Sequence, residues 1–110
     1  MTDKTATRVV TIVNPQGMHL RPADLFVRLA NQFQATVEIL KDGERFDGKS
    51  VLSMLTLAAG QGTQLSLQAS GPDAEDALTA LDELVRQGFG EMNAAESSDP
   101  VATDENRQAG

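Results

Sequence analysis

The sequence predicts an α+β domain in which a four-stranded antiparallel sheet carries three helices on one face and leaves the other face open to solvent. Segments that alternate between apolar and polar residues and segments with helical spacing follow one another through residues 1–88 in the order β-α-β-β-α-β-α. The connections between them are short, which favours antiparallel pairing of neighbouring strands. The chain has 110 residues, of which 40% are hydrophobic and 23% charged, so there is room for one core only.

The first strand is predicted at residues 8–14, where β-branched residues dominate and a Pro-Gln-Gly turn follows. The first helix is predicted over residues 20–32, because apolar residues recur there at helical spacing. Pro22 falls in the first turn of this helix, where no intrahelical N–H bond is lost. His19 therefore stands at the N-terminal end of the predicted helix.

A β-hairpin is predicted next. Residues 36–41 continue the alternating pattern, and the pair Asp42-Gly43 suits a two-residue turn before a short return strand around residues 45–46. Residues 50–58 predict a short and rather apolar helix, which begins near a serine and is ended by glycines.

The last two elements of the domain have clear boundaries in the sequence. Residues 64–69 alternate as a half-buried strand requires. The third helix is predicted after Asp73, because an amphipathic stripe follows, with acidic residues in its first turn. Arg86 in the last turn and Gly88 beyond it complete the expected signals.

The acidic residues are concentrated at the end of the chain. The net charge is −7, and residues 88–110 contribute −4 of it. These residues include few large apolar side chains, so their burial would not offset the entropy of ordering them. We therefore expect a domain at residues 1–88 and an acidic, disordered tail at residues 89–110.

Composition excludes several classes of function. The sequence has no cluster of Lys and Arg that would bind nucleic acid, and no apolar run long enough for membrane insertion. Its first residues lack the apolar run of a secretory signal, so a cytoplasmic location is the default expectation. Without cysteine there is no thiol chemistry, and we find no metal-ligand cluster, P-loop or dinucleotide fingerprint, so no metal or cofactor is expected.

The segment from Asn14 to Ala23 is the place where a nucleophile and a cation converge on a predicted helix end. A helix N-terminus presents free N–H groups that suit a phosphoryl group, and the guanidinium of Arg21 can bind its oxygens in pairs. The neutral imidazole of His19 has a lone pair for attack on phosphorus. The alternative for a lone histidine is an exposed loop residue without chemistry.

This segment resembles the active site of a known family. Gly17 to Ala23 match, position by position, the signature of HPr, the histidine-containing phosphocarrier of the bacterial phosphoenolpyruvate:sugar phosphotransferase system. Asp47 to Leu55 resemble the region around the regulatory serine of that family, and Ser50 follows His19 by the expected 31 positions. Residues 60–63 resemble the turn before the last strand of the family fold.

The resemblance implies an HPr-like open-faced β-sandwich that acts as a monomeric carrier and not as an enzyme. His19 would accept a phosphoryl group on Nδ1 from enzyme I and pass it to enzyme IIA or a related acceptor, serving sugar transport or carbon regulation. Arg21 would steady the phosphoryl oxygens. Ser50 would be modified by HPr kinase/phosphorylase in bacteria that have that enzyme, although the same hydroxyl also suits a helix N-cap.

In this family, apolar side chains beside the phosphoryl site dock on partners. Leu20 and Leu52 are the best candidates for an exposed patch, whereas helical spacing favours a buried Leu55. Arg28 and Lys49 would rim the patch, or simply serve solubility. The full set of docking candidates is Met18, Leu20, Arg28, Lys49, Val51, Leu52 and Leu55.

Two other functions remain open. A regulatory paralogue would act mainly through Ser50-dependent protein contacts. A phosphohydrolase would use His19 as its nucleophile, but it needs a second acid or base, and no carboxylate adjoins the motif before Asp24. The sequence departs from the family pattern in three places: at Gln16, which bears on how the turn before His19 is capped, at Ser53, and in the acidic C-terminal extension.

Overall fold

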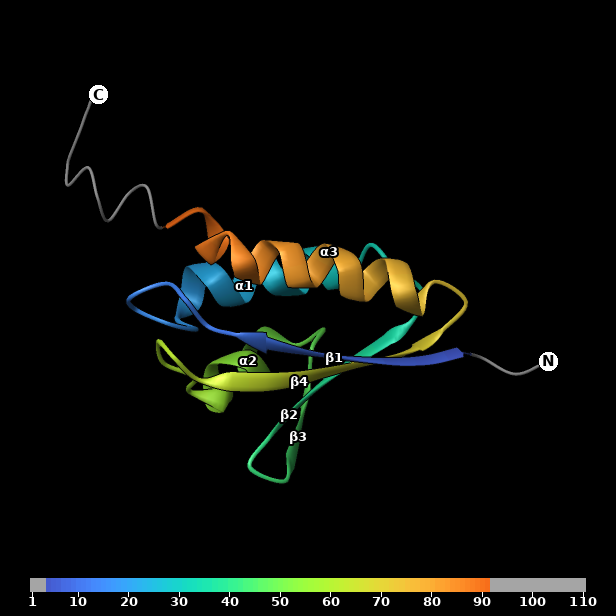
Figure 1. Cartoon of the computed structure of the whole chain (residues 1–110), viewed down its shortest axis with the longest axis horizontal. Coiled ribbons are helices and arrows are strands. Elements are labelled where there is room, and N and C mark those ends of the chain that lie inside the picture. Colours follow the sequence, from blue (N-terminus) through green and yellow to red (C-terminus); the bar gives the residue numbers. More distant parts are fainter. Residues whose placement is uncertain (1–3, 92–110) are drawn as a thin grey trace.

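The computed structural model of the chain describes residues 4–91. The predicted order of elements is confirmed, and one short turn follows the last helix (Figure 1). The elements are β1 (Lys4–Thr11), α1 (Leu20–Ala30), β2 (Thr36–Lys41), β3 (Glu44–Asp47), α2 (Val51–Leu57), β4 (Gln64–Gly71), α3 (Ala74–Arg86) and the turn η1 (Gly88–Gly90).

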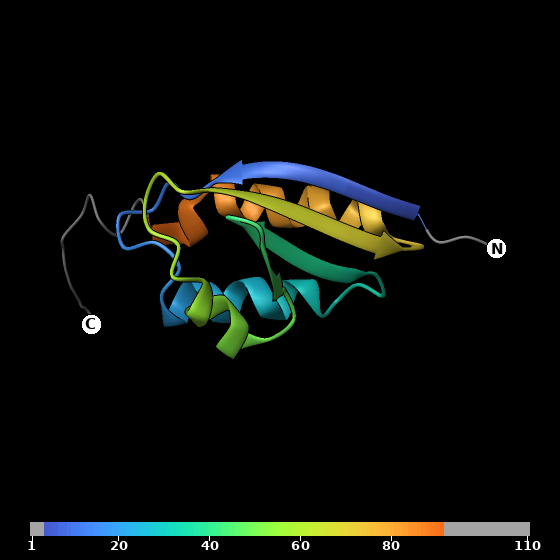
Figure 2. The ribbon, with the colours of Figure 1, turned by 90° about the horizontal axis from the view of Figure 1, so that it is seen from below.

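The four strands form one antiparallel sheet in the order β1-β4-β2-β3. The central strand β4 pairs with both β1 and β2, so that Ile39 lies opposite Leu67. The three helices cover one face, with α3 against β1 and β4 and with α1 in contact with both other helices (Figures 1 and 2). The predicted open-faced sandwich is confirmed.

Alternation along the strands decides which side chains enter the core. In β4, Leu65, Leu67 and Ala69 are buried, and the residues between them are partly exposed. This is the period-two pattern that turns one face of a sheet toward helices. The largest fully buried side chains are Phe26, Phe89, Ile12, Ile39, Met54, Leu57, Leu65, Leu67, Leu78, Leu81, Val37 and Val85.

The first strand differs from its prediction. It begins at Lys4 and ends at Thr11, whereas we expected residues 8–14. Its first half carries little apolar signal, but it pairs with β4 through the full length of that strand, from Lys4 opposite Gly71 to Thr11 opposite Gln64. Backbone pairing with a neighbouring strand therefore outweighs the weak local pattern.

The end of the domain also differs. We assigned residues 89–91 to the tail, but Phe89 is only 1% exposed and packs in the core. Glu91 is partly buried against the loop before α1. The ordered body thus extends through Glu91, and the rest of the predicted tail, residues 92–110, lies outside the described residues.

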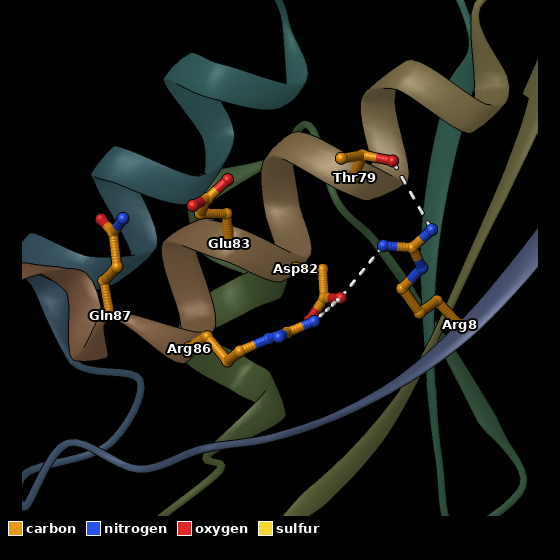
Figure 3. Close-up of a pocket in the computed structure, with 6 residues that line it drawn as sticks. All are labelled: Arg8, Thr79, Asp82, Glu83, Arg86 and Gln87. Atoms are coloured by element: carbon orange, nitrogen blue, oxygen red, sulfur yellow. Dashed lines mark hydrogen bonds and ion pairs between the residues drawn. The ribbon is translucent and has the colours of Figure 1, made fainter.

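A shared carboxylate ties β1 to α3. The buried carboxylate of Asp82 accepts hydrogen bonds from Arg8 at 3.0 Å and from Arg86 at 2.7 Å, beside a pocket of about 340 Å³ (Figure 3). Arg86 and then Arg8 hold the pKa of Asp82 below its usual value, against the opposing effect of burial. This network stabilises the packing of the helix on the edge strand.

A second carboxylate fixes the start of α3. Asp73 accepts hydrogen bonds from the backbone N–H groups of Gln34 and Ala35, at 2.9 and 2.8 Å. The bond from Gln34 is the main cause that lowers the pKa of Asp73. Asp73 therefore joins the helix to the loop before β2 instead of capping the helix with its side chain.

No helix within residues 4–91 has the length and apolar character that crossing a membrane requires.

Candidate functional site

The loop between β1 and α1 is held against the loop that precedes β4. The N–H of Met18 donates to the carbonyl of Ala59 at 2.8 Å. Gly17 has a φ of +71°, and a Cβ at this position would lie 2.4 Å from the carbonyl oxygen of Ala59. Only glycine suits both the backbone conformation and this close approach. The loop therefore presents His19, two residues after Gly17, on a fixed support.

His19 is the N-cap residue of α1. Its carbonyl accepts the first helical hydrogen bond, from Ala23 at 2.9 Å, while its side chain makes no capping bond. The side chain is 37% exposed, so the ring is accessible to solvent on one side. The first N–H groups of the helix, at Leu20 and Arg21, have no intrahelical acceptors and give this end of the helix a partial positive charge.

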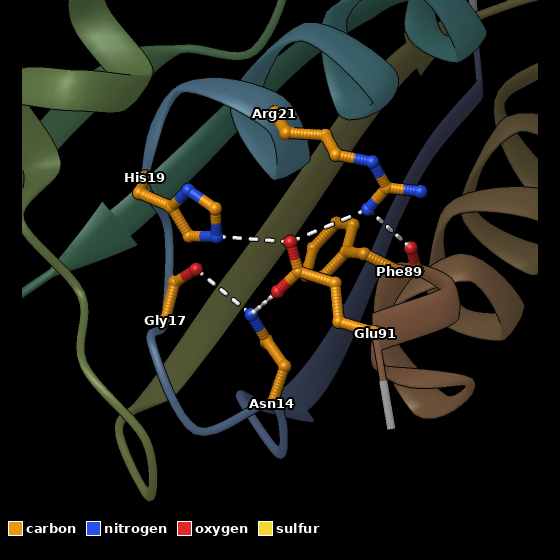
Figure 4. A network of polar contacts seen from close by, with 6 residues as sticks. All are labelled: Asn14, Gly17, His19, Arg21, Phe89 and Glu91. Carbon is orange, nitrogen blue, oxygen red and sulfur yellow. Dashed lines mark hydrogen bonds and ion pairs between the residues drawn. The ribbon is translucent and has the colours of Figure 1, made fainter. Parts of the chain in front are cut away.

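A carboxylate from the far end of the domain meets this ring (Figure 4). Glu91 Oε2 lies 2.9 Å from Nε2 of His19 and 3.3 Å from Nη1 of Arg21. The same Nη1 donates to the carbonyl of Phe89 at 3.1 Å. His19 and Arg21, which the sequence motif predicted as partners, therefore converge on one oxygen atom.

A buried amide holds the other oxygen of this carboxylate. Asn14 Nδ2 donates to Glu91 Oε1 at 2.9 Å and to the carbonyl of Gly17 at 2.8 Å. Asn14 is fully buried, and its Oδ1 has no hydrogen-bond partner among the residues that the structure describes. The amide thus joins the loop before His19 to the end of the domain.

The second ring nitrogen of His19 has no partner among residues 4–91. Nδ1 faces away from Glu91 (Figure 4) and forms no hydrogen bond to any residue between 4 and 91. A nitrogen with a free lone pair at a partly exposed helix N-terminus is able to attack an electrophilic phosphorus atom. Within the same described range, no cluster of three or more His, Cys, Asp or Glu side chains could hold a metal ion.

The predicted docking residues have different surroundings. Leu20 and Leu52 are exposed as expected, and Val51 is partly buried. Leu55 is also exposed, so its predicted place in the core is wrong, because Met54 and Leu57 already fill the inner side of the short helix α2.

Met18 does not belong to an exposed patch, and its assignment as a docking residue is wrong. Its side chain is only 5% exposed and packs in the hydrophobic core. The backbone bond from Met18 to Ala59 draws this residue inward, next to the exposed ring of His19. An apolar residue beside the motif therefore supports the loop instead of facing solvent.

The polar candidates are partly engaged. Ser50 is the N-cap of α2, and its Oγ accepts a hydrogen bond from the N–H of Ser53 at 3.2 Å, which confirms the capping interpretation. Arg28 is exposed and pairs with Asp24 at 2.8 Å. Lys49 donates through Nζ to the carbonyl of Phe33 at 2.8 Å, which restrains its charge near α1.

Sequence reasoning missed three residues of the site: Asn14, Phe89 and Glu91. Gln16, which we considered for capping the turn, is exposed, and Asn14 does this work instead. We expected no carboxylate next to the motif before Asp24, and this holds along the sequence. In the folded chain it is wrong, because the carboxylate of Glu91 contacts His19. A signal was present, since Phe89 is a single aromatic residue between two glycines in a polar segment.

Comparison with known proteins identifies relatives over most of the described domain. Residues 6–87 match the family model of the phosphotransferase system HPr component phosphorylation site. The chain is 37% identical over 82 residues to phosphocarrier protein HPr of Neisseria meningitidis, which covers 74% of this chain and 92% of that protein. It is 39% identical over 71 residues to the HPr-like protein Crh of Bacillus subtilis, covering 64% of this chain and 84% of that one.

The fold is also similar to solved structures. The crystal structure of HPr-C-His from Thermoanaerobacter tengcongensis superimposes with a TM-score of 0.76 at 36% sequence identity. The match covers 78% of this chain and 97% of the solved chain. The likeness therefore extends over the sheet and its helices and not only over the motif around His19.

Proposed function

We propose a phosphoryl-carrying role for His19 from the premise that this chain belongs to the HPr family of phosphocarrier proteins. Nδ1 of His19 accepts a phosphoryl group from phospho-enzyme I, and the chain passes it to an enzyme IIA domain or a related acceptor. The protein is the substrate of both transfers and has no reaction of its own to catalyse. In this proposal the protein is located in the cytoplasm and acts as a monomer.

The observation that carries this proposal is the free Nδ1 of a partly exposed imidazole at the N-terminus of α1, two residues before an arginine. The N–H groups of the first helical turn favour the negative charge of an incoming phosphoryl group. Arg21 is exposed, and its Nε and Nη2 donate to no residue of the described domain. These donors are available for phosphoryl oxygens, which guanidinium binds in pairs.

The two transfers are the forward and reverse of one kind of displacement. In the first, the lone pair of Nδ1 forms a bond to phosphorus, while the bond from phosphorus to the nitrogen of the donor breaks and its electron pair stays with the donor. In the second, a nucleophile of the acceptor forms the new bond to phosphorus, while the bond from phosphorus to Nδ1 breaks and its electron pair returns to Nδ1. The proton on Nε2 takes no part. Such a transfer depends on exposure and alignment of the two reacting groups, because the protein contributes positioning and charge.

Partners dock on the exposed leucines of α1 and α2 in this proposal. Leu20 follows His19 directly, and Leu52 and Leu55 lie on the neighbouring helix, which contacts α1. Exposed apolar side chains beside a reactive group are typical of protein docking surfaces. Arg28 and Lys49 contribute positive charge at the edge of this surface.

Ser50 serves regulation in hosts that have HPr kinase/phosphorylase. A phosphoryl group on Oγ would add about two negative charges at the start of α2, next to the exposed Leu52. It would weaken docking of apolar or acidic partners and favour a basic one. The similarity to Crh supports a second candidate function, a regulatory paralogue that acts through Ser50. The accessible Nδ1 of His19 favours the carrier.

Incubation with phosphoenolpyruvate and purified enzyme I tests the proposal. The expected product is an acid-labile, base-stable phosphohistidine, whose phosphoryl group moves to an added enzyme IIA domain. Acid-stable label confined to Ser50 would support the regulatory paralogue instead. Steady release of free phosphate without an acceptor protein would indicate a hydrolase.

A further inference from the structure

We propose that Glu91 is a positioning residue for His19, which holds the proton of the ring on Nε2 and so keeps the lone pair on Nδ1. This inference rests on the proposed function only in naming phosphoryl transfer as the reaction that it serves. The hydrogen bond itself is independent of the identity of any partner.

The chemistry of the contact determines the tautomer. Glu91 Oε2 lies 2.9 Å from Nε2 of His19, and an ionised carboxylate only accepts hydrogen bonds. Nε2 must therefore carry the hydrogen, and in the neutral ring Nδ1 then has none. A carboxylate that orients an imidazole in this way leaves the opposite nitrogen ready to react.

The carboxylate is itself held in place. Oε1 accepts from Asn14, and Oε2 also accepts from Arg21. Both hydrogens of the Asn14 amide go to acceptors, Glu91 and the carbonyl of Gly17, which fixes the amide orientation. Its buried Oδ1 remains without a partner in the described part of the chain, a cost that an arrangement optimised for stability alone would avoid.

The backbone before Glu91 is shaped to deliver this side chain. Gly88, Phe89 and Gly90 have φ values of +66°, +56° and +76°. A positive φ at Phe89 is strained, and such strain persists where the surroundings impose it. The burial of the Phe89 ring in the core and the bond from Arg21 to its carbonyl supply that restraint. Glu91 is consequently 16% exposed and faces the ring of His19 (Figure 4).

The same contact matters more after transfer than before it. When Nδ1 gains its bond to phosphorus and Nε2 keeps its proton, the ring acquires positive charge. The carboxylate of Glu91 faces that charge across the Nε2–H bond. An interaction that strengthens as charge develops accelerates the transfer and is not spent on ground-state binding.

The tautomer is directly measurable, because His19 is the only histidine in the sequence. Long-range ¹H–¹⁵N spectra of the uniformly labelled full chain, recorded with the ring neutral, report which nitrogen is protonated. We expect a protonated Nε2, a bare Nδ1 and an Nε2–H proton protected from exchange. In Glu91→Gln the amide can donate as well as accept. The population of the Nδ1–H tautomer of His19 should therefore rise, and the Nε2–H proton should lose its protection from exchange.

Glu44→Gln is the matched control, because Glu44 lies exposed at the start of β3 and changes the net charge equally. Its spectrum should equal that of the original chain. Glu91→Ala is the second variant, and it should lose the exchange protection without gaining the alternative donor. Ring spectra of Glu91→Gln that match the original would overturn the inference, provided that its backbone spectrum shows the folded domain.

Kinetics give the second readout. With enzyme I as phosphoryl donor, Glu91→Gln should lower kcat by about 10-fold or more, by analogy with the losses seen when a carboxylate that orients a metal-binding histidine is replaced. KM should stay unchanged, since the docking leucines are intact, and Glu44→Gln should behave as the original chain. An altered tautomer with an unchanged kcat would contradict the positioning role. Absence of phosphorylation in every variant, including the original, would refute the proposed function while the spectra still decide the hydrogen bond.

Discussion

Two carboxylates of this domain each join distant segments, and they differ in what they join. Asp82 lies between Arg8 and Arg86, whose charges are permanent. Glu91 lies between an amide, a guanidinium and an imidazole whose second nitrogen bonds to no residue of the described domain. The first arrangement stabilises the packing of α3 on β1. In our proposal, the second uses the same kind of contact to orient the imidazole that receives the phosphoryl group. An ion pair points to a function when one of its partners keeps an atom that is available for chemistry.

Replacement of His19 should have the largest effect, and the effect should be confined to chemistry. We expect His19→Ala to abolish phosphoryl acceptance, because no other histidine is present. Its melting temperature should stay close to that of the original chain, since the side chain makes no capping bond and Glu91 keeps its hydrogen bonds from Asn14 and Arg21. Labelling from phosphoenolpyruvate through enzyme I and a thermal melt measure the two quantities. Residual acid-labile label in the variant would contradict the assignment of the phosphoryl group to His19.

Replacement of Asp82 should have the opposite profile. Asp82→Asn removes a charge that accepts hydrogen bonds from Arg8 and Arg86, and it should lower the free energy of unfolding by about 2 kcal/mol. Phosphoryl acceptance by the folded variant should be unchanged. Urea denaturation and the labelling assay separate these outcomes. A loss of phosphoryl acceptance without a loss of stability would show that Asp82 belongs to the site around His19.

Arg21 should contribute to transfer more than to folding. Lysine keeps the charge of Arg21 but loses the planar pair of donors, so Arg21→Lys should slow transfer from enzyme I by about 10-fold, equivalent to about 1.4 kcal/mol. The unfolding midpoint in urea should shift little, since the guanidinium is exposed. Rapid-quench measurement of the transfer rate tests this. A wild-type rate would show that the guanidinium geometry is not used.

Ser50 provides a structural effect inside the proposed regulatory region. Ser50→Ala removes the side-chain cap of α2 and should lower the free energy of unfolding by about 1 kcal/mol. Phosphoryl acceptance at His19 should continue. Ser50→Asp keeps a capping oxygen but adds charge, and it should raise KM for enzyme I. Equal KM values for the two variants would argue against a docking role near Ser50.

Lowering the pH from 7 to about 5 should have the smallest effect of these changes on the stability of the fold. The pKa values of Asp73 and Asp82 are lowered in the folded state. The main cause is the hydrogen bond from the backbone N–H of Gln34 for Asp73 and the hydrogen bond from Arg86 for Asp82. A carboxyl group with a lowered pKa stabilises the fold above its unfolded value of 3.8, and this contribution is lost as pH falls toward the folded value. Urea midpoints should therefore be flat from pH 7 to about pH 5 and decline below about pH 4. Asp82→Asn should decline less steeply over the same range.

The sequence predicts what neighbouring residues determine. His19 and Arg21 are two positions apart at a helix start, so one local motif reveals both. Alternation predicts the buried residues of β4, and turn residues mark the hairpin between β2 and β3. Each of these signals depends on side chains that are close in the chain.

Contacts between distant segments were not predictable in the same way. Glu91 meets His19 across 72 positions, in a segment whose average composition predicts disorder. Phe89 outweighs that average, because one aromatic side chain buried between two glycines anchors the turn. Met18 illustrates the converse: its place in the motif suggested exposure, but its backbone bond to Ala59 draws it into the core.

The most direct test of the carrier role is the site of the phosphoryl group itself. The ¹⁵N-labelled chain, phosphorylated by phosphoenolpyruvate and enzyme I, should show a ³¹P signal coupled to Nδ1 of His19. The coupling should disappear when an enzyme IIA domain is added, as the phosphoryl group leaves. Phosphate bound to Nε2, phosphate only on Ser50, or no phosphate under conditions in which a known HPr is fully modified would contradict this account.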